Sequence, residues 1–251
     1  MLLVRQGNKR RIAKEIIKYF PEHNIYIEPF FGAGGIFFNK KKAKYNFVND
    51  LDEETYNLFQ VIINKPKQFE NLLKQVPKHR SLFAKWKKYT EKNEIWRAVR
   101  FVYLSNFSYM GGRETMKFGI ENTKAVTLRR IKETFHYLGD TTFDCKPYDK
   151  FLKGISLKSE KNKSNIFIYC DPPYISTIQK YYTPKWNTND FKELIQELKK
   201  IGSNFAISEF DDTQVIEVAK EEGLNIIEIG ERQNLKNIRK EILIVNYEIK
   251  Q

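Results

Sequence analysis

The sequence predicts an α/β fold in which a mainly parallel, doubly wound sheet carries a helical insertion. Short apolar runs alternate with amphipathic helical stretches in the first and last parts of the 251-residue chain, which is the pattern of βα units. Between about residues 67 and 138 the apolar residues recur mostly at helical spacing, without a parallel-strand pattern. We therefore expect an α/β domain formed by residues 1–63 and 141–251, with a helical domain inserted at residues 64–140.

The elements before the insertion follow from apolar spacing and from the residues that end each run. Ile12 and Ile16 lie on one helical stripe that Pro21 ends, and a Gly-rich turn separates the first strand from the next helix. The expected order is a helix at 9–19, a strand at 25–27, a helix beginning at 36, a strand at 47–48 and a helix at 53–63.

The insertion and the second half are assigned in the same way. Val99 and Val102 repeat at helical spacing, and residues 108–119 interrupt this pattern with a loop or β-hairpin at Gly111-Gly112. The second half is expected to contain strands at 141–144 and 166–170, a polar loop at 158–164, helices at 191–201 and 213–222, and strands at 205–207, 225–229 and 242–247.

Composition restricts the class of protein. The net charge of +13 and the pI of about 9.5 favour a polyanionic partner such as nucleic acid, with a Lys-rich solvated surface as an equal alternative. No apolar run is long enough to span a membrane, and the basic start lacks the apolar segment of a secretory signal. Cys145 and Cys170 read as reduced thiols of a cytosolic protein, and the three scattered histidines predict no metal site.

A glycine-rich turn and a carboxylate lie where a nucleotide could bind. Residues 28–35 read Glu-Pro-Phe-Phe-Gly-Ala-Gly-Gly directly after a strand, and Asp50 ends the next strand, about 20 residues on, where a carboxylate can accept ribose hydroxyls. Such a turn also occurs in NAD and FAD sites. However, the strict G-x-G-x-x-G spacing is absent, and Pro29, Phe30 and Phe31 suit stacking on adenosine better than cradling pyrophosphate.

The strongest motif is Asp171-Pro172-Pro173-Tyr174, which follows an apolar strand and should stand at the carboxyl edge of the sheet. Two prolines make the corner rigid and have no N–H, so the corner offers only acceptors, namely carbonyls and one carboxylate. This arrangement is complementary to an amine, and the Tyr174 ring offers a face on which a base could stack. The alternative is a strand that merely ends in a Pro-rich turn.

Together these motifs resemble the Dam-like family of DNA adenine methyltransferases. The resemblance rests on Gly7-Asn8-Lys9, residues 28–35 and the Asp-Pro-Pro-Tyr motif. Weaker similarity is present at Asn49-Asp50, residues 145–149, Ser208-Glu209, Arg232 and residues 241–247. It implies a Rossmann-like, SAM-dependent methyltransferase core with a mainly parallel sheet and an inserted helical target-recognition domain. The implied reaction transfers a methyl group from SAM to N6 of a flipped-out adenine in duplex DNA.

The resemblance also implies roles for individual residues. The catalytic residues would be Asp171, Pro172, Pro173 and Tyr174. The cofactor contacts would come from Arg5, Lys9, Glu28, Pro29, Phe30, Gly32, Ala33, Gly34, Asp50 and Asp171. Two positions depart from the family, because Pro147 stands where an Asp often precedes the aromatic, and Arg5 stands where an aromatic is common.

Contacts to DNA are expected from the insertion. The candidates are Asn106, Tyr109, Arg113 and Lys117, since Asn can read adenine and Arg can read guanine, although Tyr109 has packing within the domain as an equal alternative. Basic runs at 40–42, 85–88 and 129–130 could contact phosphates or form solvated faces. A cytoplasmic, bacterial or phage-encoded enzyme is implied, and the sequence leaves open whether a cognate restriction endonuclease accompanies it.

Two other interpretations remain at this stage. A methyltransferase acting on RNA, or on another planar amine or amide, would have much the same catalytic corner, although the large helical insertion favours DNA. A catalytically silent DNA-binding protein is the alternative from a different class, and the intact Asp171 and Tyr174 argue against it.

Overall fold

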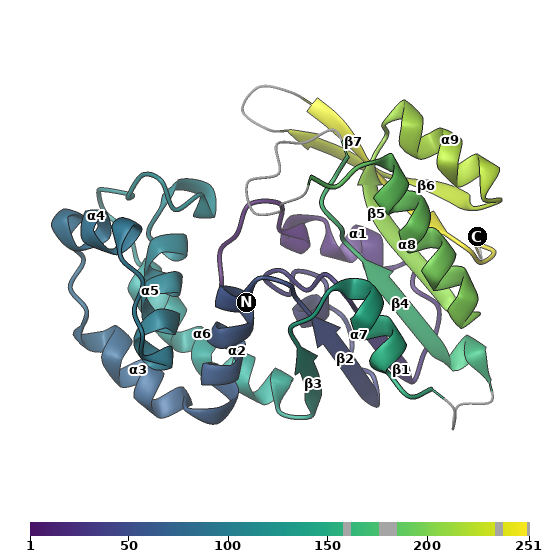
Figure 1. Ribbon diagram of the computed structural model, residues 1–251. Helices are drawn as coiled ribbons and strands as arrows, with labels where there is room; N and C mark the ends of the chain where they lie inside the picture. Colours follow the sequence, from purple (N-terminus) through teal and green to yellow (C-terminus); the bar gives the residue numbers. More distant parts are fainter. Residues whose placement is uncertain (158–161, 176–184, 234–237, 250–251) are drawn as a thin grey trace.

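The computed structural model describes residues 1–157, 162–175, 185–233 and 238–249 and is built around a seven-stranded sheet (Figure 1). The strand order is β3-β2-β1-β4-β5-β7-β6; β1 to β5 pair in parallel, and β7 lies antiparallel between β5 and β6. The strands are β1 Ile25–Glu28, β2 Tyr45–Asn49, β3 Thr141–Asp144, β4 Ile166–Cys170, β5 Asn204–Phe210, β6 Asn225–Gln233 and β7 Ile238–Val245.

The strand order reverses between β1 and β4. From β1 the chain moves to β2 and β3 on one side, and it then returns to β4 and β5 on the other side. Ligands of doubly wound folds bind at such a switch point, outside the carboxyl ends of the strands. The pairing of Ile27 with Ile168 therefore brings the end of β1 next to the end of β4, where Glu28 and Asp171 stand.

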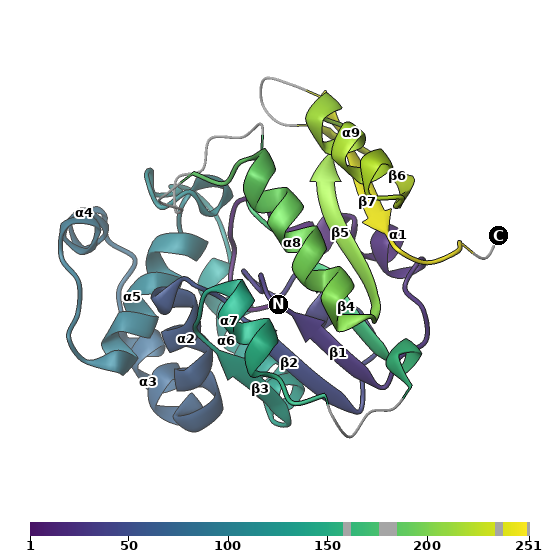
Figure 2. The ribbon, with the colours of Figure 1, turned by 45° about the vertical axis from the view of Figure 1, so that its right-hand side comes forward.

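Helices cover both faces of the sheet (Figure 2). On one face pack α7 (Tyr148–Gly154), α8 (Thr188–Ile201) and α9 (Thr213–Glu221). The other face packs against α1 (Ala13–Ile17), the short 3₁₀ helix η2 (Phe37–Asn39) and Phe59. Because both faces are covered, every residue of β4 is buried, and an unbroken apolar run is the sequence that such a strand requires.

A helical part lies beside the sheet (Figure 1). It consists of α2 (Glu53–Asn64), α3 (Pro66–Gln75), α4 (Arg80–Lys88), α5 (Glu94–Asn106) and α6 (Thr123–Leu138). α5 contacts α2, α3 and α4, and Leu2 and Leu3 are buried in the same core. α2 joins the two parts, since Leu58 packs in the helical core and Phe59 packs under the sheet.

Several expected elements have different bounds. The helix expected at 9–19 is a 3₁₀ turn, η1 (Lys9–Arg11), followed by α1, because Ile12 leaves helical geometry with φ −110° and ψ 7°. The helix expected from residue 36 is only the 3₁₀ turn η2. α7 was not expected from the sequence. Residues 108–119 contain η3 (Tyr109–Gly111) and one antiparallel bridge between Ser108 and Met116.

The polar loop expected at 158–164 lies partly outside the described residues, and its described end contains the 3₁₀ helix η4 (Lys163–Asn165). Among the described residues, the structure contains no helix whose length and apolarity would let it cross a membrane.

Candidate active site

Lys9 and Asp171 meet at the switch point. The Lys9 side chain is 3% exposed, and its Nζ lies 2.6 Å from Asp171 Oδ1 and 3.5 Å from Glu241 Oε1. Asn8 brings Lys9 to this place, because its side chain caps η1 by accepting a hydrogen bond from Arg10 N at 2.8 Å. The Gly7-Asn8-Lys9 motif and the Asp-Pro-Pro-Tyr motif therefore come together although Lys9 and Asp171 are 162 residues apart in the chain.

Gly35 is needed for this approach. A Cβ atom at Gly35 would stand 2.5 Å from Asn8 Oδ1, closer than real Cβ contacts come, and 3.0 Å from Lys9 N, which is an unusually tight contact. The glycine-rich turn thus packs directly under the segment that carries Lys9. Sequence reasoning marked both segments without predicting this contact.

Tyr174 is buried behind the corner formed by Asp171, Pro172 and Pro173. It is 7% exposed, its hydroxyl donates a hydrogen bond to Glu241 Oε1, and its ring meets Phe210 edge-on at 4.7 Å between centroids. Lys9 Nζ lies 4.5 Å from the centroid of the same ring. Burial, together with the neighbouring negative charge of Asp171, raises the pKa of Tyr174 well above its usual value.

Asp50 fixes the glycine-rich turn. Its Oδ2 accepts from Gly32 N at 2.5 Å and its Oδ1 accepts from Asp52 N at 2.9 Å. Gly32 and Gly34 have φ of +56° and +70°, which favour glycine. Burial raises the pKa of Asp50 above its usual value. A carboxylate has about four lone-pair sites, so Asp50 keeps acceptor capacity for a ligand.

Glu28 lies in a buried polar group at the end of β1. Tyr26 donates its hydroxyl hydrogen to Glu28 Oε2 at 2.8 Å, and Lys40 Nζ lies 4.1 Å from the centroid of the Tyr26 ring. Burial raises the pKa of Glu28 well above its usual value and lowers that of Lys40 to about 8. Lys40 is 5% exposed, so within the basic run 40–42 this residue is not available as a surface phosphate contact.

Three aromatic rings gather beside the glycine-rich turn. Phe30 follows β1, Tyr148 begins α7 and Trp186 precedes α8. The Phe30 centroid lies 5.4 Å from that of Tyr148 and 5.7 Å from that of Trp186, and Tyr148 and Trp186 are 5.7 Å apart. Flat faces of this kind suit a planar ring. Sequence reasoning did not include Trp186, because a lone Trp before a helix has no distinctive pattern.

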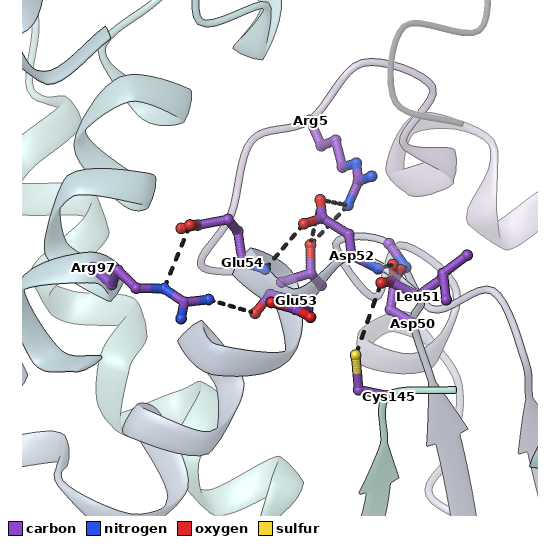
Figure 3. Close-up of polar contacts among 10 residues, drawn as sticks. Arg5, Asp50, Leu51, Asp52, Glu53, Glu54, Arg97 and Cys145 are labelled. Carbon is purple, nitrogen blue, oxygen red and sulfur yellow. Dashed lines mark hydrogen bonds and ion pairs between the residues drawn. The ribbon is translucent and has the colours of Figure 1, made fainter. Parts of the chain in front are cut away.

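Arg5 contacts the start of α2. Its Nη1 donates to Thr55 Oγ1 at 2.7 Å and lies 3.2 Å from Asp52 Oδ2 (Figure 3). Arg97 from α5 reaches the same helix end, with Nε 3.4 Å from Glu54 Oε1. Arg5 therefore contributes to the junction between the sheet and the helical part.

The expected DNA contacts separate into two groups. Asn106 is 2% exposed, accepts from Val4 N at 2.8 Å, and donates to Leu2 O at 2.9 Å and to Thr127 Oγ1 at 3.0 Å. Its amide binds the N-terminal segment to the helical core, so in this structure the buried side chain is not available to read a base edge.

The other three candidates share one loop after α5. Tyr109 is 57% exposed, and Arg113 and Lys117 are partly exposed. This loop packs closely on the N-terminal segment at Gly111. A Cβ atom at this position would stand 2.6 Å from Val4 O, so the close packing requires glycine. The basic run at 85–88 is exposed except for Trp86, which is 4% exposed. Arg130 donates to Met1 O at 3.0 Å.

This fold and site define a class of enzyme. A glycine-rich turn, a strand-end carboxylate and the Asp171 corner meet at the switch point of a doubly wound sheet, where ligands of such folds bind. The family model described as D12 class N6 adenine-specific DNA methyltransferase matches residues 6–235, and the chain belongs to this family. The methyl donor of such an enzyme is S-adenosyl-L-methionine.

Relatives agree with this assignment. A DNA adenine methylase of Vibrio cholerae serotype O1 is 22% identical over 88% of this chain and 85% of its own length. A type II methyltransferase of Lactococcus lactis subsp. cremoris, M1.LlaDCHI, is 24% identical over 96% of this chain and 93% of its own length. Among solved structures, the rRNA methyltransferase aviRa from Streptomyces viridochromogenes has a TM-score of 0.41 at 10% identity, covering 93% of this chain and 82% of that one.

Proposed function

We propose that this family member is a site-specific DNA-methyltransferase (adenine-specific) that uses the Asp171 corner to present the N6 amine of a flipped-out adenine in duplex DNA. The single observation on which the proposal rests is the partly exposed Asp171 carboxylate, which accepts from the amino group of Lys9 at 2.6 Å at the sheet switch point. The corner that binds this nitrogen donor suits another nitrogen donor of similar size.

The chemistry of adenine requires such a corner. The lone pair of the N6 amine is delocalised into the ring, so the amine is a poor nucleophile. The Asp171 carboxylate and the Pro172 carbonyl would accept its two N–H bonds and favour a tetrahedral nitrogen with a directed lone pair. Lys9 Nζ binds Asp171 Oδ1, and because a carboxylate has about four lone-pair sites, Asp171 can hold Lys9 and still accept from the amine.

The residues beside this corner fit the cofactor. SAM, when bound, supplies an electrophilic methyl group. Gly32 and Gly34 let a ligand approach the backbone, and Asp50 keeps acceptor capacity for hydroxyls. Phe30 and Tyr148 offer aromatic faces at the same edge. Lys9, Glu28, Pro29 and Ala33 complete the proposed cofactor contacts.

The duplex would lie between the corner and the helical part. Tyr109, Arg113 and Lys117 share a loop that is held against the N-terminal segment, and that segment leads to Lys9. Arg113 would read a base edge and Lys117 would contact phosphate or base. A base inside a duplex cannot reach Asp171, so it has to be flipped out. Tyr174 is 7% exposed in this structure, so its ring would have to open toward the base in order to stack on it.

The test is methyl transfer by purified variants to plasmid duplex from a methylation-free host, with the modified base identified by sequencing. Asp171→Ala should lower the rate about 100-fold or more while retaining DNA binding, because phosphates supply most of that affinity. Asp140→Ala is the matched control, since the Asp140 side chain is 93% exposed. Transfer at the parental rate by a folded Asp171→Ala enzyme, or methylation of RNA rather than duplex DNA, would refute the proposal.

The similarity to a type II methyltransferase supports a restriction–modification setting as the proposed biological role. The methylated plasmid should then resist a restriction endonuclease that cuts the same site. Sensitivity to every endonuclease whose site contains the modified adenine would exclude this role and leave the enzymatic assignment intact.

A further inference from the structure

Two buried carboxyl groups hold the catalytic corner from behind. Glu209 on β5 and Glu241 on β7 are both 0% exposed, and neither is needed to accept the target amine. Lys, Glu, Arg and Asp are almost never fully buried unless they are paired. Glu209 and Glu241 lie on neighbouring strands inside the sheet, so the burial of two such carboxyl groups there needs a physical reason.

Glu209 binds the backbone after the motif. Its Oε1 accepts from Ile175 N at 2.9 Å, and its Oε2 accepts from Phe210 N at 2.8 Å. Ile175 directly follows Tyr174, so Glu209 fixes the point where the chain leaves the catalytic corner. Burial raises the pKa of Glu209 to about 8, and these two backbone hydrogen bonds act in the opposite direction.

Glu241 binds the side chain of the motif. Its Oε1 accepts from the Tyr174 hydroxyl and lies 3.5 Å from Lys9 Nζ. Lys9 in turn contacts Asp171, so one amino group joins the carboxylate at the front of the corner to the carboxyl group behind it.

The two carboxyl groups approach from opposite faces of the sheet. In the antiparallel ladder Glu209 pairs with Ile242 and Phe210 pairs with Glu241, and directly paired residues share a face while adjacent residues alternate. Ile242 belongs to the core under α7 to α9, and Leu243 belongs to the core on the α1 side. Glu209 therefore contacts the corner from the face that α7 to α9 cover, and Glu241 contacts it from the face on the α1 side.

Stability alone does not explain this arrangement. Burying a carboxyl group is costly, and replacing buried charged groups by well-packed apolar residues is often neutral or stabilising. Ionisable groups whose burial is unfavourable are typical of functional sites. What Glu209 and Glu241 determine is the position of Tyr174, with its ring edge-on to Phe210.

We propose that Glu209 and Glu241 are positioning residues that clamp the catalytic corner from the two faces of the sheet and fix the Tyr174 ring for stacking on the target base. This inference rests on the proposed function of the corner. It also assigns a role to the Tyr174 hydroxyl, in addition to the stacking face of the ring.

A double-mutant cycle on methyl transfer tests the Glu241 contact. Tyr174→Phe should lower kcat about tenfold, the effect of one lost hydrogen bond to a carboxyl group. Glu241→Met should lower kcat at least as much, because it also removes the contact with Lys9. The double variant should be no slower than Glu241→Met alone, because Tyr174→Phe removes a contact that Glu241→Met has already removed. A matched control is Glu228→Gln, since Glu228 lies exposed on β6 and pairs with Lys240 at 3.2 Å; it should transfer methyl at the parental rate.

Glu209 is tested by graded replacement. Glu209→Gln keeps one carbonyl oxygen for a backbone N–H, so its kcat should lie between those of the parent and Glu209→Leu. Duplex with 2-aminopurine at the target adenine reports stacking directly. Its fluorescence should be quenched by the parental enzyme and should be brighter with Glu241→Met or Glu209→Leu.

These experiments distinguish a failure of the positioning role of Glu209 and Glu241 from a failure of the proposed methyltransferase function. If the parental enzyme methylates duplex DNA but the kcat losses of the single variants multiply, the clamp is wrong and the proposed function stands. The clamp is also overturned if these variants lower only the melting temperature and leave kcat and the 2-aminopurine signal at parental values. A parental enzyme that methylates no duplex overturns both.

Discussion

Asn106 offers a direct test of whether a sequence motif residue reads DNA or holds the fold. The Asn106 amide is buried, and it satisfies the Val4 N–H and the Leu2 carbonyl across more than 100 residues of chain. Asn106→Ala would leave both backbone groups without this partner, and each such loss costs about 1–3 kcal/mol. We therefore expect the free energy of unfolding to fall by about 2–5 kcal/mol, close to the upper end of single substitutions.

The assay combines urea denaturation with sequencing of the adenines that the folded variant methylates. Asn64→Ala is the control, because Asn64 is exposed and donates only a 3.3 Å hydrogen bond to Gln60; its stability should change by less than about 0.5 kcal/mol. The choice of methylated site should be the same in the parent and in Asn106→Ala. Unchanged stability together with an altered recognition site would refute the structural role and restore Asn106 as a base-reading residue.

Two further predictions concern the turn under Lys9 and the response to acid. Gly35→Ala should weaken SAM binding and lower stability by about 1–3 kcal/mol, because the added Cβ would meet Asn8 and Lys9; calorimetry showing parental affinity would contradict this. Burial lowers the pKa of His23 to about 4, below its usual 6.5, so only the unfolded chain gains this proton between those values. Stability should fall as pH drops through this window, by at most about 3 kcal/mol, and His23→Gln should remove that part of the pH dependence in denaturant titrations.

The sequence predicted those parts of the fold in which local pattern and burial agree. The strands at 141–144 and 166–170 have the expected bounds, because each is a short run of strand formers ended by a polar residue or Pro. α7 was missed because seven residues with three lysines or glycines show little periodicity. The break at Ile12 was missed because a 3₁₀ turn keeps nearly the same apolar spacing as a helix.

The candidate site was predictable as motifs but not as contacts. The glycine-rich turn and the Asp-Pro-Pro-Tyr corner each indicate a ligand site. Parallel pairing of β1 with β4 then brings both to the carboxyl ends of these strands. That Lys9 would contact Asp171 depends on packing across 162 residues, which no local pattern contains. Asn106 looked like a DNA-reading residue because its type suits adenine, whereas its burial depends on the path of residues 1–4.

The sequence around Glu209 and Glu241 contains a local pattern that indicates their burial. Each carboxylate interrupts or borders an apolar strand, in the runs Phe-Ala-Ile-Ser-Glu-Phe and Glu-Ile-Leu-Ile-Val, and both strands lie inside the sheet rather than at its edge. A charged residue at such a position is either turned to solvent or held by a partner, and here both faces are covered by helices. Because burial of an unpaired carboxylate is so unfavourable, an acidic residue within a central apolar strand predicts a buried polar partner at the strand end. In this chain Glu241 binds the Tyr174 hydroxyl and Glu209 binds Ile175 N, at the corner that we propose to be catalytic.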